Sequence, residues 1–328
     1  MALAIDQYFP PREPLETVPV MRALVAAHRH LAELKGVAKT IPNEGLLIST
    51  LSLQEAQSSS EIENIITTQD ALYRQQIQPA QADPASKEVA RYIDGLQVGL
   101  RAVRQTGLLT VNTITDIQAV LEGNTAGFRR TPGTVLRNQQ TGEVVYQPPS
   151  PQQVPELMGQ LERYLHNDTT TDPLIRMAVA HHQFETIHPF YDGNGRTGRI
   201  VNVLLLVRDG LLDSPILYLS RYISQTKDRY YKELQHLRDT GDWEGWLVYL
   251  LNGIAVTAQH TTALVEAIGR LLQTHKHFIR KQYRFYSQDL INNIFRHPYT
   301  KVAFVEHELG VSRATATRYL DALAADGI

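Results

Sequence analysis

The 328-residue chain has no cysteine, and its formal net charge at pH 7 is only -2. Without cysteine it can form neither a disulfide nor a thiolate metal site. The near-neutral balance and a pI near 6.6 argue against a general binder of polyanions. No apolar run is long enough to span a bilayer, and residues 1–12 lack the regions of a signal peptide. These absences predict a cytoplasmic protein without a membrane partner, long enough for two or three domains.

What the sequence does contain is concentrated in residues 188–199, which combine a histidine, an acid, three glycines and two arginines. Helical patterns flank this stretch. Residues 172–184 begin with Asp172 as N-cap and Pro173 at the first helical position, and residues 200–207 are almost entirely apolar. A glycine-rich turn that opens a helix leaves free backbone N–H groups at the positive end of the helix dipole, where anions bind. The stretch therefore predicts a polyphosphate site with a titratable base beside it.

Arg196 and Arg199 lie three residues apart, so on a helix they share one face and can clamp phosphate oxygens. Other motifs fit the stretch less well. The glycines spell a dinucleotide fingerprint, but a helical pattern precedes them and no βαβ rhythm follows. A calcium loop would need a glutamate where Val203 stands. The nearby histidines lack the i,i+4 spacing of a helical zinc pair.

The same residues match every fixed position of the pattern H-x-F-x-[D/E]-G-N-G-R-x-x-R, so the stretch resembles the signature of the Fic-domain family. This resemblance implies transfer of AMP from ATP to a Ser, Thr or Tyr hydroxyl of a target protein, or of the chain itself, with release of pyrophosphate. It makes His188 the general base, which suits an imidazole that titrates near neutrality. It makes Asp192 the ligand of Mg²⁺. By the same resemblance the phosphates contact Gly193, Asn194, Gly195, Arg196, Thr197, Gly198 and Arg199.

A second segment, residues 58–64, taken alone predicts a helix start with serine caps and acids in its first turn. A helix would place Ser59 and Glu63 on one face. Ser59-x-x-x-Glu63-Asn64 also resembles the inhibitory motif of the Fic family, [S/T]-x-x-x-E-[G/N]. This resemblance implies that Glu63 pairs with Arg199 and keeps the γ-phosphate of ATP out of its place. We therefore expect an autoinhibited enzyme.

Helical spacing of apolar residues predicts a mainly α-helical fold. The expected helices cover about residues 19–34, ended by Gly36, and then residues 46–57, 86–103, 112–121, 151–166 and 246–281. Residues 134–137 and 143–146, with a turn between them, predict a β-hairpin. By resemblance the hairpin is a flap in which Val144, Val145 and Tyr146 hold the target segment in an extended form.

Tyr230 has two interpretations, core packing or a contact with the nucleotide base, and the resemblance places a base contact in this part of the chain. Arg238 stands where some relatives carry an asparagine. Residues 287–295, 301–308 and 312–325 predict three short helices with a turn at residues 309–312. They resemble a helix-turn-helix, or winged-helix-like, unit in which Ser312 caps the last helix. DNA binding would use exposed residues of that helix, for which the candidates are Arg313, Thr315, Thr317 and Arg318.

The alternative for this C-terminal unit is protein docking or dimerisation. Because the chain stops where wing strands would begin, a truncated unit is one expectation. The predicted architecture is a Fic-type helical core with a β-hairpin flap and a C-terminal helix-turn-helix. Its parts are residues 1–105 with the inhibitory helix, residues 106–255 as catalytic core, and residues 256–328 as connector helix and terminal unit.

Two rival functions stay open. One is an ATP-sensing DNA-binding regulator, and the other uses the same pocket to remove AMP or to transfer another nucleotide or phosphocholine. The expected ligands are ATP and Mg²⁺. The expected partners are target proteins, the chain itself, DNA and a second copy in a homodimer.

Overall fold

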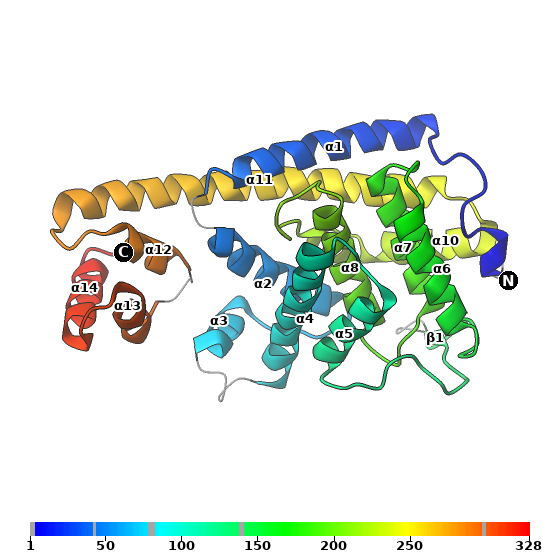
Figure 1. Cartoon of the computed structure of the whole chain (residues 1–328), viewed down its shortest axis with the longest axis horizontal. Coiled ribbons are helices and arrows are strands. Elements are labelled where there is room, and N and C mark those ends of the chain that lie inside the picture. Colours follow the sequence, from blue (N-terminus) through cyan, green and yellow to red (C-terminus); the bar gives the residue numbers. More distant parts are fainter. Residues whose placement is uncertain (1–3, 42–43, 78–82, 138–140, 297–299) are drawn as a thin grey trace.

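The structure, a computed structural model, describes residues 4–41, 44–77, 83–137, 141–296 and 300–328. It is mainly helical with one short hairpin, as the sequence predicts (Figure 1). After a 3₁₀ turn at Ile5–Gln7, the N-terminal half contains α1 (Val18–Ala38), α2 (Glu44–Ile62), α3 (Gln69–Ile77), α4 (Pro84–Thr106) and α5 (Val111–Glu122). After the hairpin come α6 (Val154–Asn167), α7 (Pro173–Ile187), α8 (Asn194–Arg208), α9 (Leu219–Gln225) and α10 (Lys227–Thr240). The C-terminal part contains α11 (Glu244–Gln282), α12 (Gln288–Arg296), α13 (Val302–Leu309) and α14 (Arg313–Ala325).

Helices α7 and α8 form the centre of the main body, and nearly all of their side chains are buried. Helix α7 begins as predicted, because the side chain of Asp172 accepts a hydrogen bond from the Leu174 N–H at 2.8 Å and Pro173 is the first helical residue. Helices α4, α5 and α2 pack against α8, so the start of α8 is surrounded by elements distant in sequence. This packing places the start of α8 at the core of the molecule.

The longest helix, α11, runs beside α1 and continues without a break for 39 residues to the C-terminal unit (Figure 1). The prediction that Gly36 ends the first helix was wrong, since α1 continues to Ala38. Glycine inside a helix costs only about 1 kcal/mol, and burial of the apolar stripe of α1, from Val20 to Leu34, offsets that cost.

Helix α2 extends through the serine-rich segment to Ile62, so these serines and acids lie at the end of a helix and not at its start. That part of the prediction was wrong because tertiary contacts of Ser58, Ser59 and Ser60, all buried, override their preference for caps. The helix ends where Asn64 takes a left-handed conformation, with φ at 64°.

The hairpin consists of β1 (Leu136–Arg137) and β2 (Val144–Tyr146), which pair antiparallel with Leu136 opposite Tyr146. It confirms the predicted strand pair, although residues 138–140 of the predicted turn lie outside the described residues.

Two hydrophobic clusters organise the chain. One runs from Ile5 to Val265, and a smaller one runs from Leu272 to Leu323 and joins the end of α11 to α12, α13 and α14. Ser312 caps α14, its hydroxyl accepting from the Thr315 N–H at 3.3 Å. The proposed boundaries at residues 105 and 255 remain predictions. No helix within the described residues combines the length and the apolar character needed to cross a membrane.

Candidate active site

His188 ends α7 in the left-handed conformation, with φ at 49°, which is rare for a residue with a side chain. Its N–H donates to the carbonyl of Phe184 at 3.0 Å, and its carbonyl accepts from Arg129 Nε at 2.8 Å. The backbone N–H of Arg129 donates to the carbonyl of Pro189 at 2.9 Å. These bonds hold the unusual turn in place, as is typical of strained backbone at a functional site.

The imidazole of His188 is in its neutral form, which can accept a proton, but its pKa lies below the near-neutral value expected from the sequence. Burial and the positive charges of Arg238 and Arg129 lower the pKa of His188 to about 4. At neutral pH the ring is therefore uncharged. Its Nδ1 is buried and has no hydrogen-bond partner within the described residues. The ring is thus a neutral acceptor next to the glycine-rich loop.

That loop is held closed by Asn194. Its side-chain oxygen accepts from the Phe190 N–H at 2.9 Å, and its side-chain nitrogen donates to the Phe190 carbonyl at 2.9 Å. Phe190 itself is fully buried. The Asn194 amide thus closes the loop through its oxygen and one N–H, and its contact with phosphate stays a prediction.

The first turn of α8 forms an anion-binding site, here called the anion seat, because its first backbone N–H groups have no partner within the helix. Gly193 precedes it in the left-handed conformation, with φ at 76°. A Cβ on Gly195 would collide with Glu63 Oε1, so the carboxylate of Glu63 lies directly over this turn. Thr197 is fully buried, and a Cβ on Gly198 would lie 3.0 Å from Glu185 Oε1 of α7. The phosphate contacts of Thr197 and Gly198 stay predictions.

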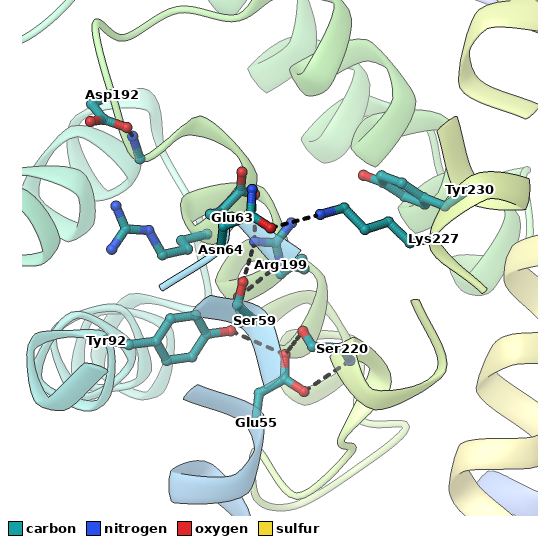
Figure 2. A network of polar contacts seen from close by, with 12 residues as sticks. Glu55, Ser59, Glu63, Asn64, Tyr92, Asp192, Arg199, Ser220, Lys227 and Tyr230 are labelled. Carbon is teal, nitrogen blue, oxygen red and sulfur yellow. Dashed lines mark hydrogen bonds and ion pairs between the residues drawn. The ribbon is translucent and has the colours of Figure 1, made fainter. Parts of the chain in front are cut away.

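Arg199 is hydrogen-bonded to Ser59 and Glu63 at the end of α2 (Figure 2). Its Nε donates to the Ser59 hydroxyl at 2.8 Å, and its Nη2 donates to the Ser59 carbonyl at 2.8 Å and to Glu63 Oε1 at 2.8 Å. The guanidinium is 3% exposed and the Glu63 side chain 34%. Although burial opposes it, the attraction of Arg199 lowers the pKa of Glu63 below its usual value, so the glutamate stays ionised. The contact between Glu63 and Arg199 that the resemblance implies is therefore present.

Arg196 is engaged by two acids that the sequence did not point to. Its Nη1 lies 2.6 Å from Glu88 Oε1, and its Nη2 lies 2.9 Å from Glu122 Oε1. Glu122 also packs against Gly193. Both terminal nitrogens of Arg196 have a carboxylate partner in this conformation, and its role in binding the outer phosphates stays a prediction.

Asp192 is exposed at the mouth of the loop, where its Oδ1 accepts from the Gly193 N–H at 2.7 Å. No cluster of three metal-binding acids or histidines occurs within the described ranges. Mg²⁺ typically binds to one or two carboxylates while phosphates and water complete its shell. One exposed carboxylate beside an anion seat fits that arrangement.

Tyr230 is 1% exposed, and its hydroxyl lies 2.9 Å from His181 Nε2. This burial favours core packing over a base contact for Tyr230 in this conformation. Its neighbour Tyr231 is 46% exposed and close enough to Glu63 and Arg199 for their charges to affect its pKa.

Arg238, at the position noted in the sequence, is buried. It donates to the Thr186 hydroxyl at 3.1 Å and to the Glu185 carbonyl at 3.2 Å. Its guanidinium also stacks 4.0 Å from the ring of Tyr146. Of the three flap residues, Val144 and Val145 are about half exposed, whereas Tyr146 is buried and donates to the Thr186 carbonyl at 3.1 Å. The hairpin is thereby attached to the end of α7, two residues before the base.

Three family models match the chain. The Fic/DOC family N-terminal model covers residues 21–101, the Fic/DOC family model covers residues 108–206, and the model of the C-terminal domain of SoFic-like protein adenylyltransferases covers residues 271–328.

Among curated proteins, a probable protein adenylyltransferase of Aquifex aeolicus is 40% identical over 83 residues, which are 25% of this chain and 26% of that protein. Protein adenylyltransferase Fic of Drosophila melanogaster is 32% identical over 133 residues, 39% of this chain and 26% of that protein. The matched part thus spans about a quarter of these relatives.

Solved structures share the fold. A Fic family protein from Desulfovibrio desulfuricans G20 superposes with a TM-score of 0.64 at 20% identity, covering 96% of this chain and 92% of that one. A Fic-1 fragment from Caenorhabditis elegans gives a TM-score of 0.56 at 20% identity, covering 76% and 73%. With the complete signature at the start of α8, three consecutive family models and this common fold, the chain belongs to the Fic/DOC family.

Proposed function

We propose that the chain is a protein adenylyltransferase that moves AMP from ATP to a hydroxyl of a target protein and that Glu63 inhibits it. The observation that carries the proposal is the position of the Glu63 carboxylate over the first turn of α8, where it is bound to Arg199 beside a neutral histidine. The names of the relatives, which are protein adenylyltransferases, support it.

In this proposal His188 accepts the proton of a Ser, Thr or Tyr hydroxyl. The hydroxyl oxygen then forms a bond to the α-phosphorus of ATP, while the bond from that phosphorus to the bridging oxygen breaks and pyrophosphate leaves. A neutral imidazole at neutral pH is the form that can act as this base. The free N–H groups at the start of α8 stabilise the charge that develops on the α-phosphate oxygens.

Glu63 inhibits because its carboxylate occupies the place and the hydrogen bonds that a terminal phosphate would use. When Glu63 moves away, Arg199 gains a phosphate as partner and the α-phosphate aligns with His188. Asp192 would hold Mg²⁺, which supplies charge neutralisation at the phosphates. Tyr231, exposed beside Glu63, is the aromatic side chain that we assign to the nucleotide base in place of Tyr230.

The target segment lies along the hairpin. Val144 and Val145 are exposed on a strand that ends at Tyr146, and Tyr146 is anchored beside the base. Pairing between main chains would hold a target in extended form with little demand on its sequence.

The test uses ATP labelled at the α-phosphate with wild type, Glu63→Gly, and Glu63→Gly combined with His188→Ala. We expect label on the chain or on lysate proteins to rise with Glu63→Gly. Loss of the base should then lower the label by about 10²- to 10⁴-fold. Absence of label in every variant, despite ATP binding, would contradict the proposal. Faster loss of label from pre-labelled protein in wild type than in Glu63→Gly would favour AMP removal instead.

A further inference from the structure

Three polar residues lie at intervals of four at the end of α2, namely Glu55 and Ser59 within the helix and Glu63 directly after its last residue. Ser59 and Glu63 contact Arg199, as described above. Glu55 lies two turns earlier and has no part in the proposed chemistry. It is nevertheless 4% exposed, although a buried carboxylate is costly unless it is well bonded.

Glu55 receives three hydrogen bonds from two other helices (Figure 2). Its Oε2 accepts from the Ser220 N–H at 3.0 Å, and its Oε1 accepts from the Ser220 hydroxyl and from the Tyr92 hydroxyl at 3.1 Å. Ser220 is the second residue of α9, so the carboxylate also lies at the positive end of that helix. The residue therefore ties α2 to both α9 and α4.

This anchor is continuous with the inhibitory contact. The Tyr92 hydroxyl that donates to Glu55 also has Ser59 as a hydrogen-bonding neighbour, and Ser59 accepts from Arg199. Apart from Glu55 and Ser59, the bonded polar side chains in the last turns of α2 each make a single hydrogen bond to their surroundings. Ser58 pairs with Tyr218 at 3.2 Å, and the exposed Glu61 with Ser224 at 3.3 Å.

We propose that Glu55 is a positioning residue of the inhibitory contact, which holds the end of α2 where Ser59 and Glu63 reach Arg199. The inference rests on the proposed autoinhibition and names a second acid on which it depends. Glu63 follows the last residue of α2 and is one-third exposed, so its own contacts do not fix the helix. Glu55 supplies that fixation from inside the core.

Glu55→Gln keeps the shape of the side chain but replaces one acceptor oxygen by a donor, which opposes the donors that now face Glu55. We expect α2 to loosen and α-phosphate label to rise about 5- to 30-fold, the range that one or two kcal/mol produces. Ser220→Ala removes only the hydroxyl donor and should give a smaller rise. If Glu55→Gln fails to fold, Ser220→Ala tests the proposal in its place.

The experiment compares wild type, Glu55→Gln, Glu63→Gly and the double variant, with label transfer and the Kd for ATP as readouts. If Glu55 acts through Glu63, Glu55→Gln by itself raises label transfer. The double variant then transfers no more label than Glu63→Gly. Asp209→Asn is the matched control, because Asp209 is also a mostly buried carboxylate bonded by Arg176 and Arg208, but at the far end of α8. It should lower the Tm without raising label.

Two results overturn the inference. Label that rises with Glu63→Gly but stays at the wild-type level in both Glu55→Gln and Ser220→Ala would show that Glu55 does not position the contact. An equal rise in Asp209→Asn would show that general destabilisation releases the enzyme. Failure of Glu63→Gly itself to raise label would instead contradict the proposed function and this inference with it.

Discussion

Arg196 and Arg199 lie one turn apart in α8 and are equally buried, at 3% exposure, yet their acidic partners differ. Arg196 lies between Glu88 of α4 and Glu122 of α5, two helices that pack on α8 and on each other. Arg199 has a single carboxylate from the end of α2, on a side chain that is 34% exposed. To lose its carboxylate partners, Arg196 needs two side chains on two helices to move, whereas Arg199 needs only Glu63 to move.

The difference indicates two uses of one kind of ion pair. The pairs of Arg196 are structural and hold the glycine-rich turn against α4 and α5. The pair of Arg199 is releasable and therefore suited to control access to the anion seat. The following predictions test this contrast.

The largest effect is expected from Arg196→Ala. Removing the cation leaves two carboxylates close together and mostly buried, which costs about 3–5 kcal/mol of unfolding free energy. Urea unfolding monitored by circular dichroism measures it. Glu63→Gln, which breaks the releasable pair, should cost no more than about 1.5–3 kcal/mol. Equal losses in the two variants would contradict the distinction.

The next effect concerns activity. Glu63→Gly removes a charge-assisted hydrogen bond of about 1.5–3 kcal/mol, so label transfer should rise about 10- to 150-fold. Glu122→Gln is the matched variant at the fixed pair and should leave label at the wild-type level, since Glu88 still holds Arg196. A rise with Glu122→Gln would mean that the Arg196 pair also regulates.

A smaller effect is expected at Asn64, whose φ of 64° ends α2 directly after Glu63. Asn64→Ala makes this left-handed conformation cost about 1–2 kcal/mol more than at glycine. Glu63 should then be held less well, with label rising about fivefold for 1 kcal/mol. Asn64→Gly, which accepts the conformation, is the control. The same rise in both variants would rule out backbone conformation as the cause.

The last prediction concerns the pH dependence of label transfer through His188. The effect is smallest at neutral pH and clear in acid. The pKa of His188 is lowered to about 4, so the folded protein keeps the imidazole unprotonated well below 6.5. In Glu63→Gly, label transfer should fall on the acid side with a midpoint near 4. Glu63 raises this pKa, so its removal does not shift the midpoint upward. Arg238→Gln, which removes a nearby cation, should move it to higher pH. A midpoint at 6.5 in Glu63→Gly would contradict the assignment.

The part of the site that is local in sequence could be predicted. The loop at residues 188–199, the cap at Asp172 and the i,i+4 pair of Ser59 and Glu63 all lie within short segments whose spacing determines geometry. The contact of Glu63 with Arg199 was expected only because the motif resembles a known inhibitory one. Local rules failed at Gly36 and at Ser58–Ser60, where packing overrides propensity.

The remainder depends on contacts between distant segments. Glu88 and Glu122 lie 108 and 74 residues from Arg196, and Glu55 lies 165 residues from Ser220. No short sequence pattern indicates contacts between residues so far apart in the chain. The repeated spacing of Glu55, Ser59 and Glu63 was the one available sign, and it shows a common face without naming the partners. Tyr230 and Tyr231 are adjacent, and only the packing of α10 decides which one is exposed.

The central claim is that Glu63 occupies the place of a terminal phosphate, so that AMP transfer occurs only after Glu63 has moved away. The most direct measurement incubates wild type and Glu63→Gly in parallel with ATP labelled at the α- or at the γ-phosphate and follows label bound to protein. We predict that Glu63→Gly gains α-label far above wild type and gains no γ-label. Incorporation of γ-label, or α-label that is equal in the two proteins, would contradict the claim.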